Sequence, residues 1–230
     1  NTATNIVLDR LGSTHADRMA FVNEFLRAEG LKNTRILNRL YSWQTKQQSP
    51  EGIRYGVGVA TPEDMVLLLE KIHRRTLVDS AASAAMLAIL NDQAFNTAIP
   101  RYLPSDRHPS IAVAHKTGTV NETKADVGLI LSDRAEIALA VFVDKHPDHT
   151  EGPDNRATLL IAHAARAVWN HFTGEQGYDD RTLSGADVDW NLFPGGRWAI
   201  WRMPSDRSMP KMWPEGPTAC ARASRQWPVP

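Results

Sequence analysis

The sequence has a single cysteine, Cys220, so no disulfide can form within the chain, and cysteine usage leaves the redox compartment open. Lys and Arg number 26, as do Asp and Glu, so no overall field favours nucleic acid or an anionic membrane as a partner. The longest apolar stretches, 81–90 around Ser83 and 137–143, are far shorter than the ~20 residues that span a bilayer. The chain opens without the charged and apolar regions of a signal peptide. The charge balance favours a small neutral or singly charged ligand, and the sequence leaves the oligomeric state undetermined.

The first part of the chain is patterned as helices, and with 42% hydrophobic residues in 230 it can build a core. Asn1 or Thr2 can cap a first helix that ends near Gly12, and Ser13 or Thr14 can cap a second that ends near Gly30, since each is followed by apolar residues at helical spacing. Residues 31–60 show no clear period and are interpreted mainly as a long loop, a kind of segment that is usually functional in a compact domain.

Two further helices are predicted before the pattern changes. Thr61-Pro62 is a strong helix start, because proline suits the first helical position. Asp79 or Ser80 begins another helix, which runs through Leu90.

From residue 111 the pattern changes to short β-like runs. Consecutive antiparallel strands are predicted at Ile111–Gly118, Asp126–Ser132 and Ala135–Val143, the last two joined by a tight turn at Asp133-Arg134. A helix over about 154–172 has one apolar side and is suited to lie across that sheet. The sequence therefore predicts a layered α/β (α+β) protein with a helical lobe and an antiparallel sheet flanked by a helix.

Residues 173–230 differ in composition from the rest. They hold five of the seven Trp and seven of the fourteen Pro, and this proline density is incompatible with long regular elements. We interpret them as an appended segment, either a poorly ordered extension or a small flap with a hairpin at Gly195-Gly196 that supports Arg197–Trp201. The predicted domain boundary lies between residues 172 and 173.

The run Lys116-Thr117-Gly118 ends the first predicted strand and is the most informative motif. A phosphate-binding loop is excluded, because its glycine would precede the lysine. K-T-G on an edge strand, with S-x-x-K and S-D-N elsewhere, marks serine β-lactamases and penicillin-binding proteins. The chain opens on Asn1-Thr2-Ala3, which looks like S-D-N entered at its last letter. From Asn1 to about 172 the chain therefore resembles the C-terminal portion of a class A β-lactamase-like or penicillin-binding serine hydrolase.

This resemblance implies roles for seven residues in catalysis and substrate binding. Lys116 would supply positive charge, Thr117 would hydrogen-bond the substrate carboxylate, Gly118 would leave space for the substrate, and Thr119 would give its N–H to the oxyanion hole. The remaining implied site residues are Asn1, which would receive the substrate's side-chain amide, Lys124, which would contact the carboxylate, and Asn38. Each has a plainer structural interpretation: Lys116 an edge-strand lysine, Asn1 a helix cap, and Lys124 a solvated turn lysine.

The long loop departs from the family pattern at the deacylation base. Ile36-Leu37-Asn38 resembles the end of E-x-x-L-N, whose Glu activates the deacylating water, but Thr34 stands at the position of that Glu. A hydroxyl cannot serve as the base that a carboxylate would. Glu51 is the remaining carboxylate in the loop and is a weak candidate for a substitute. The departure favours a penicillin-binding relative over an efficient β-lactamase.

Three other patterns are set aside. The literal S-x-x-K at Ser208–Lys211 includes Pro210, which prevents the helix that this chemistry needs. The polar cluster after the third strand is interpreted as a solvated connection, because Pro147 and Gly152 make it a loop and no metal site is expected. His115 alternates to the strand face opposite Lys116 and is interpreted as a packing residue.

The resemblance implies acyl transfer from a β-lactam or a peptidoglycan-like peptide through an acyl-serine, without a cofactor or metal. It also implies β-lactam catabolism, antibiotic resistance and a periplasmic or secreted location. The serine nucleophile would lie upstream of Asn1, so we expect this chain to be an incomplete, inactive fragment whose third predicted strand has an unpaired edge. A D-alanyl-D-alanine peptidase, a penicillin-binding protein and a non-catalytic binding protein on the same fold remain alternatives.

Overall fold

The structure is a computed structural model that describes residues 1–41, 49–120, 122–175 and 197–202. The chain divides into two compact units, Asn1–Leu68 and Leu69–Pro230, which are described separately. In the described part of the chain no helix is long and apolar enough to cross a membrane.

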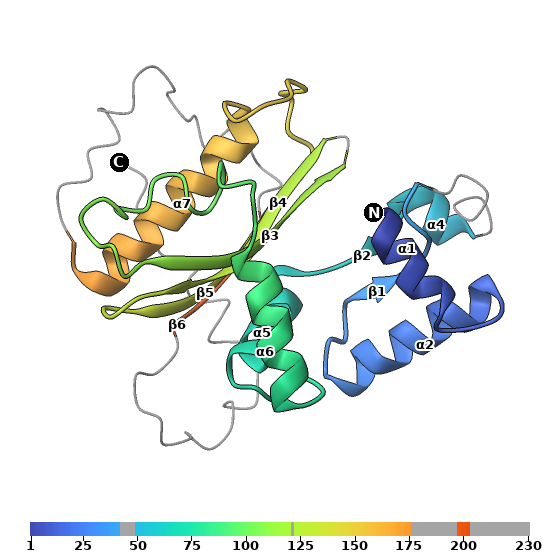
Figure 1. Cartoon of the computed structure of the whole chain (residues 1–230). Coiled ribbons are helices and arrows are strands. Elements are labelled where there is room, and N and C mark those ends of the chain that lie inside the picture. The colour runs from blue at the N-terminus through green and yellow to red at the C-terminus, as the bar shows by residue number, and fades with distance from the viewer. Residues whose placement is uncertain (42–48, 121, 176–196, 203–230) are drawn as a thin grey trace. The chain divides into compact units, whose positions relative to one another are not determined.

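The first unit is mainly helical and begins with two of the predicted helices, α1 (Thr2–Asp9) and α2 (His15–Ala28) (Figure 1). The start of α2 is a capping box, in which the Thr14 side chain accepts a hydrogen bond from Asp17 N and the Asp17 side chain accepts one from Thr14 N. Asn1 is the N-cap of α1, but its side chain makes no capping hydrogen bond. Helix α5 (Pro62–His73) begins at the predicted proline and crosses the boundary between the units.

The segment predicted as mainly loop also contains short regular elements that the sequence did not indicate. Strands β1 (Arg35–Ile36) and β2 (Gly58–Val59) pair in antiparallel fashion, and helix α4 (Pro50–Tyr55) lies between them in sequence. Two-residue strands are too short to produce a detectable alternation. A Cβ at Gly58 would lie 2.7 Å from Arg35 O, so this pairing requires glycine.

The second unit contains the predicted sheet. Helix α6 (Ser80–Asn91), capped by Asp79, contacts the first strand of this sheet, β3 (Ala112–Val120). Strands β3 (Ala112–Val120), β4 (Thr123–Leu131) and β5 (Glu136–Val143) are consecutive and antiparallel, which confirms the prediction with small shifts of their ends. The Ser132 hydroxyl accepts hydrogen bonds from Arg134 N and Ala135 N and so closes the predicted turn.

The expected unpaired edge of the third predicted strand is not found. Strand β6 (Arg197–Arg202) pairs with β5 from Ile137↔Arg202 to Phe142↔Arg197, and the sheet order is β3-β4-β5-β6. The mistake came from assuming that this neighbour comes only from the N-terminal part of the fold. Strand β6 coincides with residues 197–201, for which one interpretation of the sequence expected a hairpin-supported flap. The remainder of 176–230 lies outside the described residues.

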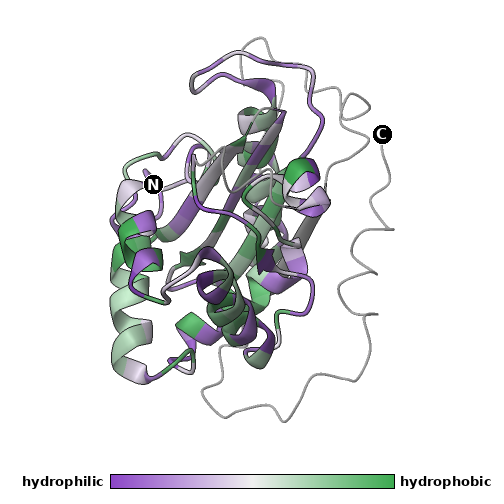
Figure 2. Ribbon diagram, turned by 90° about the vertical axis from the view of Figure 1, so that its right-hand side faces the viewer, coloured by the Kyte–Doolittle hydropathy of each residue, from purple (hydrophilic) through white to green (hydrophobic). Residues whose placement is uncertain are grey.

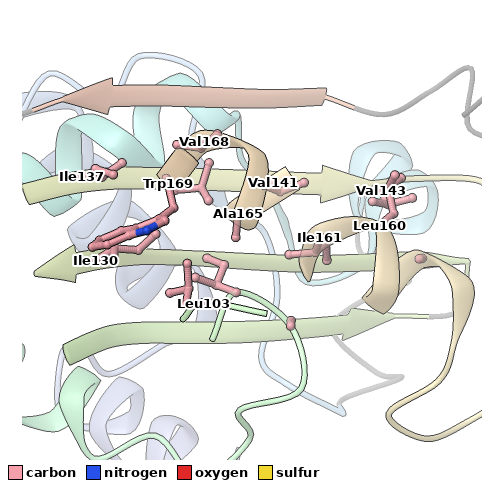
Figure 3. Packing of buried hydrophobic residues seen from close by; sticks show 14 of the residues in the cluster. Leu103, Ile130, Ile137, Val141, Val143, Leu160, Ile161, Ala165, Val168 and Trp169 are labelled. Carbon is pink, nitrogen blue, oxygen red and sulfur yellow. The ribbon is translucent and has the colours of Figure 1, made fainter. Parts of the chain in front are cut away.

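Helix α7 (Arg156–Thr173) lies across one face of the sheet, as predicted, and forms the core with it (Figure 3). Trp169 and Ile161 of α7 are 0% and 1% exposed and pack in one cluster with Ile130, Ile137 and Val143 of the strands. Burying such a side chain contributes about 1.5–3 kcal/mol, so this cluster holds α7 to the sheet. Green and purple segments both occur along the helices in Figure 2, as amphipathic helices require.

Candidate active site

The K-T-G motif lies on the exposed edge strand of the four-stranded sheet. β3 has β4 as its neighbour on one side, and the described residues include no strand on the other side. Lys116, Gly118 and Thr119 are exposed and Thr117 is half-buried. Because backbone N–H and C=O groups on a free strand edge can bind an extended ligand, residues 116–119 form a wall open to one. We call these four residues the substrate wall, after the role that the K-T-G resemblance implies for them.

Two details describe the space at the substrate wall. The Lys116 ammonium donates a hydrogen bond to Thr117 O at 2.5 Å, so its charge lies against its own strand. A Cβ built on Gly118 would meet only Ala125 Cβ, at 3.8 Å, within 4 Å, so this position is open. A cation beside an open backbone edge suits an anionic group such as a carboxylate.

Lys124 lies on β4 directly across from Thr119. Because side chains alternate along strands, Lys124 shares a face with Thr119 and Thr117, whereas Lys116 and Gly118 belong to the other face. The sheet therefore brings together Lys124 and the four residues of the substrate wall, five of the seven predicted site residues, with one ammonium group on each face.

His115 is buried, as its position opposite Lys116 predicted, but it does more than pack. Its Nδ1 lies 2.9 and 3.0 Å from the two carboxylate oxygens of Asp126, and both side chains are 0% exposed. Since a carboxylate only accepts, Nδ1 carries the proton. Asp126 also accepts a hydrogen bond from Ile99 N at 3.0 Å, and His115 Nε2 lies 3.2 Å from Asn96 Oδ1.

The other two predicted site residues, Asn1 and Asn38, lie in the first unit. Asn1 is exposed at the start of α1. Asn38 is 1% exposed, and its amide donates to Gly56 O at 2.5 Å while its backbone N–H donates to Val57 O. Asn38 thus ties the two ends of the segment between β1 and β2 together.

Two carboxylates near the predicted base position, Glu51 of the loop and Asp64 of α5, are both engaged in interactions. The Thr34 hydroxyl donates to Asp64 Oδ2 at 2.8 Å, and the same oxygen accepts Asn33 N at 2.8 Å. Glu51 forms an ion pair with Arg35. The hydrogen bond from Arg35 lowers the pKa of Glu51, which makes this carboxylate a weaker base.

The polar loop after β5 is built around Asp148. Its carboxylate accepts hydrogen bonds from Arg156 N at the start of α7 and from the backbone and hydroxyl of Thr150, and these bonds lower its pKa to about 2. His146 is 1% exposed, and burial lowers its pKa. Among the described residues no group of three His, Cys, Asp or Glu side chains could hold a metal ion. The Ser208–Lys211 motif lies outside the described residues.

Sequence reasoning missed Asp126, Asn96, Gly128 and Asp64. A glycine inside a β pattern is a recognised sign of close backbone approach, so Gly128 offered a signal. A Cβ there would lie 2.5 Å from His115 Cβ. Asp126 and Asp64 looked like an ordinary strand residue and an ordinary first-turn acid, and only the tertiary pairing distinguishes them.

Comparison with known proteins bears on the family and the fold of the chain. The model of a family described as the beta-lactamase enzyme family matches residues 1–172. A beta-lactamase from Sphaerobacter thermophilus DSM 20745 superposes with a TM-score of 0.62 at 23% identity, covering 76% of this chain and 59% of that one. PBP-A superposes with a TM-score of 0.57 at 24% identity, covering 76% and 57%.

A third solved structure is a mutant of PBP-A as an acyl-enzyme complex with penicillin G. It has a TM-score of 0.56 at 25% identity and covers 76% of this chain and 57% of that one. No curated protein matches the chain. The chain spans less than two thirds of the length of each of these three solved proteins.

Proposed function

The chain belongs to the beta-lactamase enzyme family, and we propose that the protein it represents is acylated on serine by β-lactams or peptide-like amides. The observation that carries the proposal is the open substrate wall on the edge strand. Lys116, Thr117 and Gly118 follow one another there, on a strand edge whose backbone pairs with no other described strand. A K-T-G sequence on an edge strand is typical of the serine hydrolase superfamily of β-lactamases and penicillin-binding proteins.

The proposed acylation divides the work between a serine and the substrate wall. The serine oxygen attacks the carbonyl carbon and passes its proton to a lysine one helical turn later, and the C–N bond of the lactam or amide then breaks. In this proposal the Thr119 N–H donates a hydrogen bond to the oxygen on which negative charge develops, Lys116 and Thr117 bind the substrate carboxylate, and Gly118 leaves room for the substrate backbone. The described residues contain no S-x-x-K motif that could supply the serine and lysine of this step, and we propose that the 230-residue chain alone is inactive.

Deacylation is proposed to be the slower step. It needs a base beside a positioned water, and Thr34 stands where the family places that base. Glu51 is held by Arg35, and Asp64 Oδ2 already accepts two hydrogen bonds. Loss of a general base costs on the order of 10²–10⁴ in rate. This observation favours a penicillin-binding or D-alanyl-D-alanine peptidase activity over rapid β-lactam hydrolysis. The family supports a location in the periplasm or outside the cell.

Intact-mass spectrometry of the protein expressed from its complete reading frame, mixed with benzylpenicillin, tests the proposal. We expect a covalent adduct that persists for minutes. Rapid return to free enzyme with hydrolysed product would overturn slow deacylation, and Glu51→Gln would then show whether Glu51 is the base. No adduct at all would leave the non-catalytic binding protein as the better interpretation.

The 230-residue chain by itself provides the companion measurement. Incubation with a chromogenic cephalosporin and a fluorescent penicillin should give neither turnover nor label. Label on Ser208 would show that the S-x-x-K motif there is active after all.

A further inference from the structure

The buried His115–Asp126 pair joins three segments of the second unit. His115 belongs to β3, Asp126 to β4, and the Asn96 and Ile99 groups that complete the network precede β3 in sequence. Both ionisable side chains are fully removed from solvent. A buried pair of this kind is poorly explained by stability, because apolar residues of similar volume are often as stable or more so.

The surroundings are built for this pair. Gly128 lies directly across from His115, and a Cβ there would lie 2.5 Å from His115 Cβ and 3.0 Å from Ala114 O. Any other residue at 128 would push β3 away from β4. The missing side chain thus lets the imidazole of His115 reach the carboxylate of Asp126 diagonally across the two strands.

The register of β3 needs such a device. Most of the strand after His115 is exposed, so burial of apolar side chains specifies its register weakly. A slip by two residues would keep every side chain on its face, yet it would move Lys116 by about 6.8 Å along the sheet. The His115–Asp126 bond forms only in the observed register, in which Asp126 lies opposite Thr117.

We propose that the His115–Asp126 pair is a positioning element that fixes the register of the edge strand and so places residues 116–119 for a ligand carboxylate. The ligand part rests on the proposed function, whereas the register part does not. His115 and Asp126 touch no substrate in this proposal and act through the substrate wall.

Amide hydrogen exchange on the 230-residue chain tests the register part. His115→Leu removes the donor at similar size, and His115→Asn keeps an N–H near the Nδ1 position. We expect His115→Leu to accelerate exchange of the β3 amides at least about tenfold, with less than about threefold change in α7 and β5, and His115→Asn to restore most of the protection. Asp126→Asn provides the same test if His115→Leu fails to fold, and Ile161→Val is the control for general loosening of the core.

Acylation of the complete protein tests the ligand part. His115→Leu should slow acylation by benzylpenicillin at least about tenfold more than acylation by its methyl ester, because only the free acid depends on the placement of Lys116 and Thr117. Unchanged β3 exchange in the variants, uniform acceleration as in Ile161→Val, or equal slowing of acid and ester would overturn the proposal. If the wild-type protein is not acylated at all, the proposed function fails, while the exchange measurement still decides the register role.

Discussion

Replacing Gly128 by alanine is the sharpest test of how the sheet holds its edge strand. The new Cβ would lie 2.5 Å from His115 Cβ, 3.0 Å from Ala114 O and 3.1 Å from His115 Cα. Two of these three atoms are backbone, so no change of side-chain rotamer relieves the contact and β3 itself has to move. Overpacking of this kind costs typically 1–3 kcal/mol, and the backbone contacts place this case near about 3 kcal/mol.

Thermal and urea unfolding, followed by circular dichroism, measure the effect. A loss of about 3 kcal/mol corresponds to a fall in Tm of about 6–12 °C for a chain of this size. The urea midpoint should fall while the slope stays unchanged.

Gly118→Ala is the matched control, because it makes the same chemical change on the partner strand. Its new Cβ would meet only Ala125 Cβ at 3.8 Å, so stability should change by no more than about 0.5 kcal/mol. The same methyl group would intrude on the substrate wall, so acylation of the complete protein should slow without loss of stability. The reasoning is wrong if Gly128→Ala unfolds at the wild-type temperature, or if Gly118→Ala is the more destabilising of the two.

Three further predictions concern the loop base and two titrating groups. In the complete protein, Thr34→Glu should shorten the lifetime of the penicillin adduct about 10²-fold or more, whereas Thr34→Gln should leave it unchanged. Equal adduct lifetimes in intact-mass spectra would count against position 34 as the place where the deacylation base is missing. The pKa of Asp148 is lowered to about 2, so its contribution to stability is present above about pH 4 and is lost as the pH falls toward 2. Asp148→Asn should therefore cost roughly 1 kcal/mol of stability at pH 7, allowing for solvent screening. Between about pH 4 and about pH 2 the urea midpoint of this variant should depend less on pH than that of the wild type. Burial lowers the pKa of His146, so the unfolded state binds a proton more readily and stability should fall as the pH drops below about 6.5; a His146→Leu variant with the same pH dependence would refute this assignment.

Local patterns in the sequence were enough for helix α5 and for strands β3, β4 and β5, of which β3 carries residues 116–119. Helix α5 begins at Thr61-Pro62 because proline suits the first helical turn, and the three strands after residue 111 follow from alternation over eight or nine residues. The face of His115 followed from its parity with Lys116. In each case the deciding interaction joins residues close in sequence.

Tertiary structure alone decided the features that join distant segments. Strand β6 pairs with β5 across more than fifty residues of chain, and no local pattern names that partner. The bonds of Asp126 to His115 and of Thr34 to Asp64 depend on strand register and on how the loop returns to α5. Periodicity determines which face of an element is buried. It does not determine the partner of a buried polar group, because leaving such a group unpaired costs free energy only in the folded chain, where water cannot reach it.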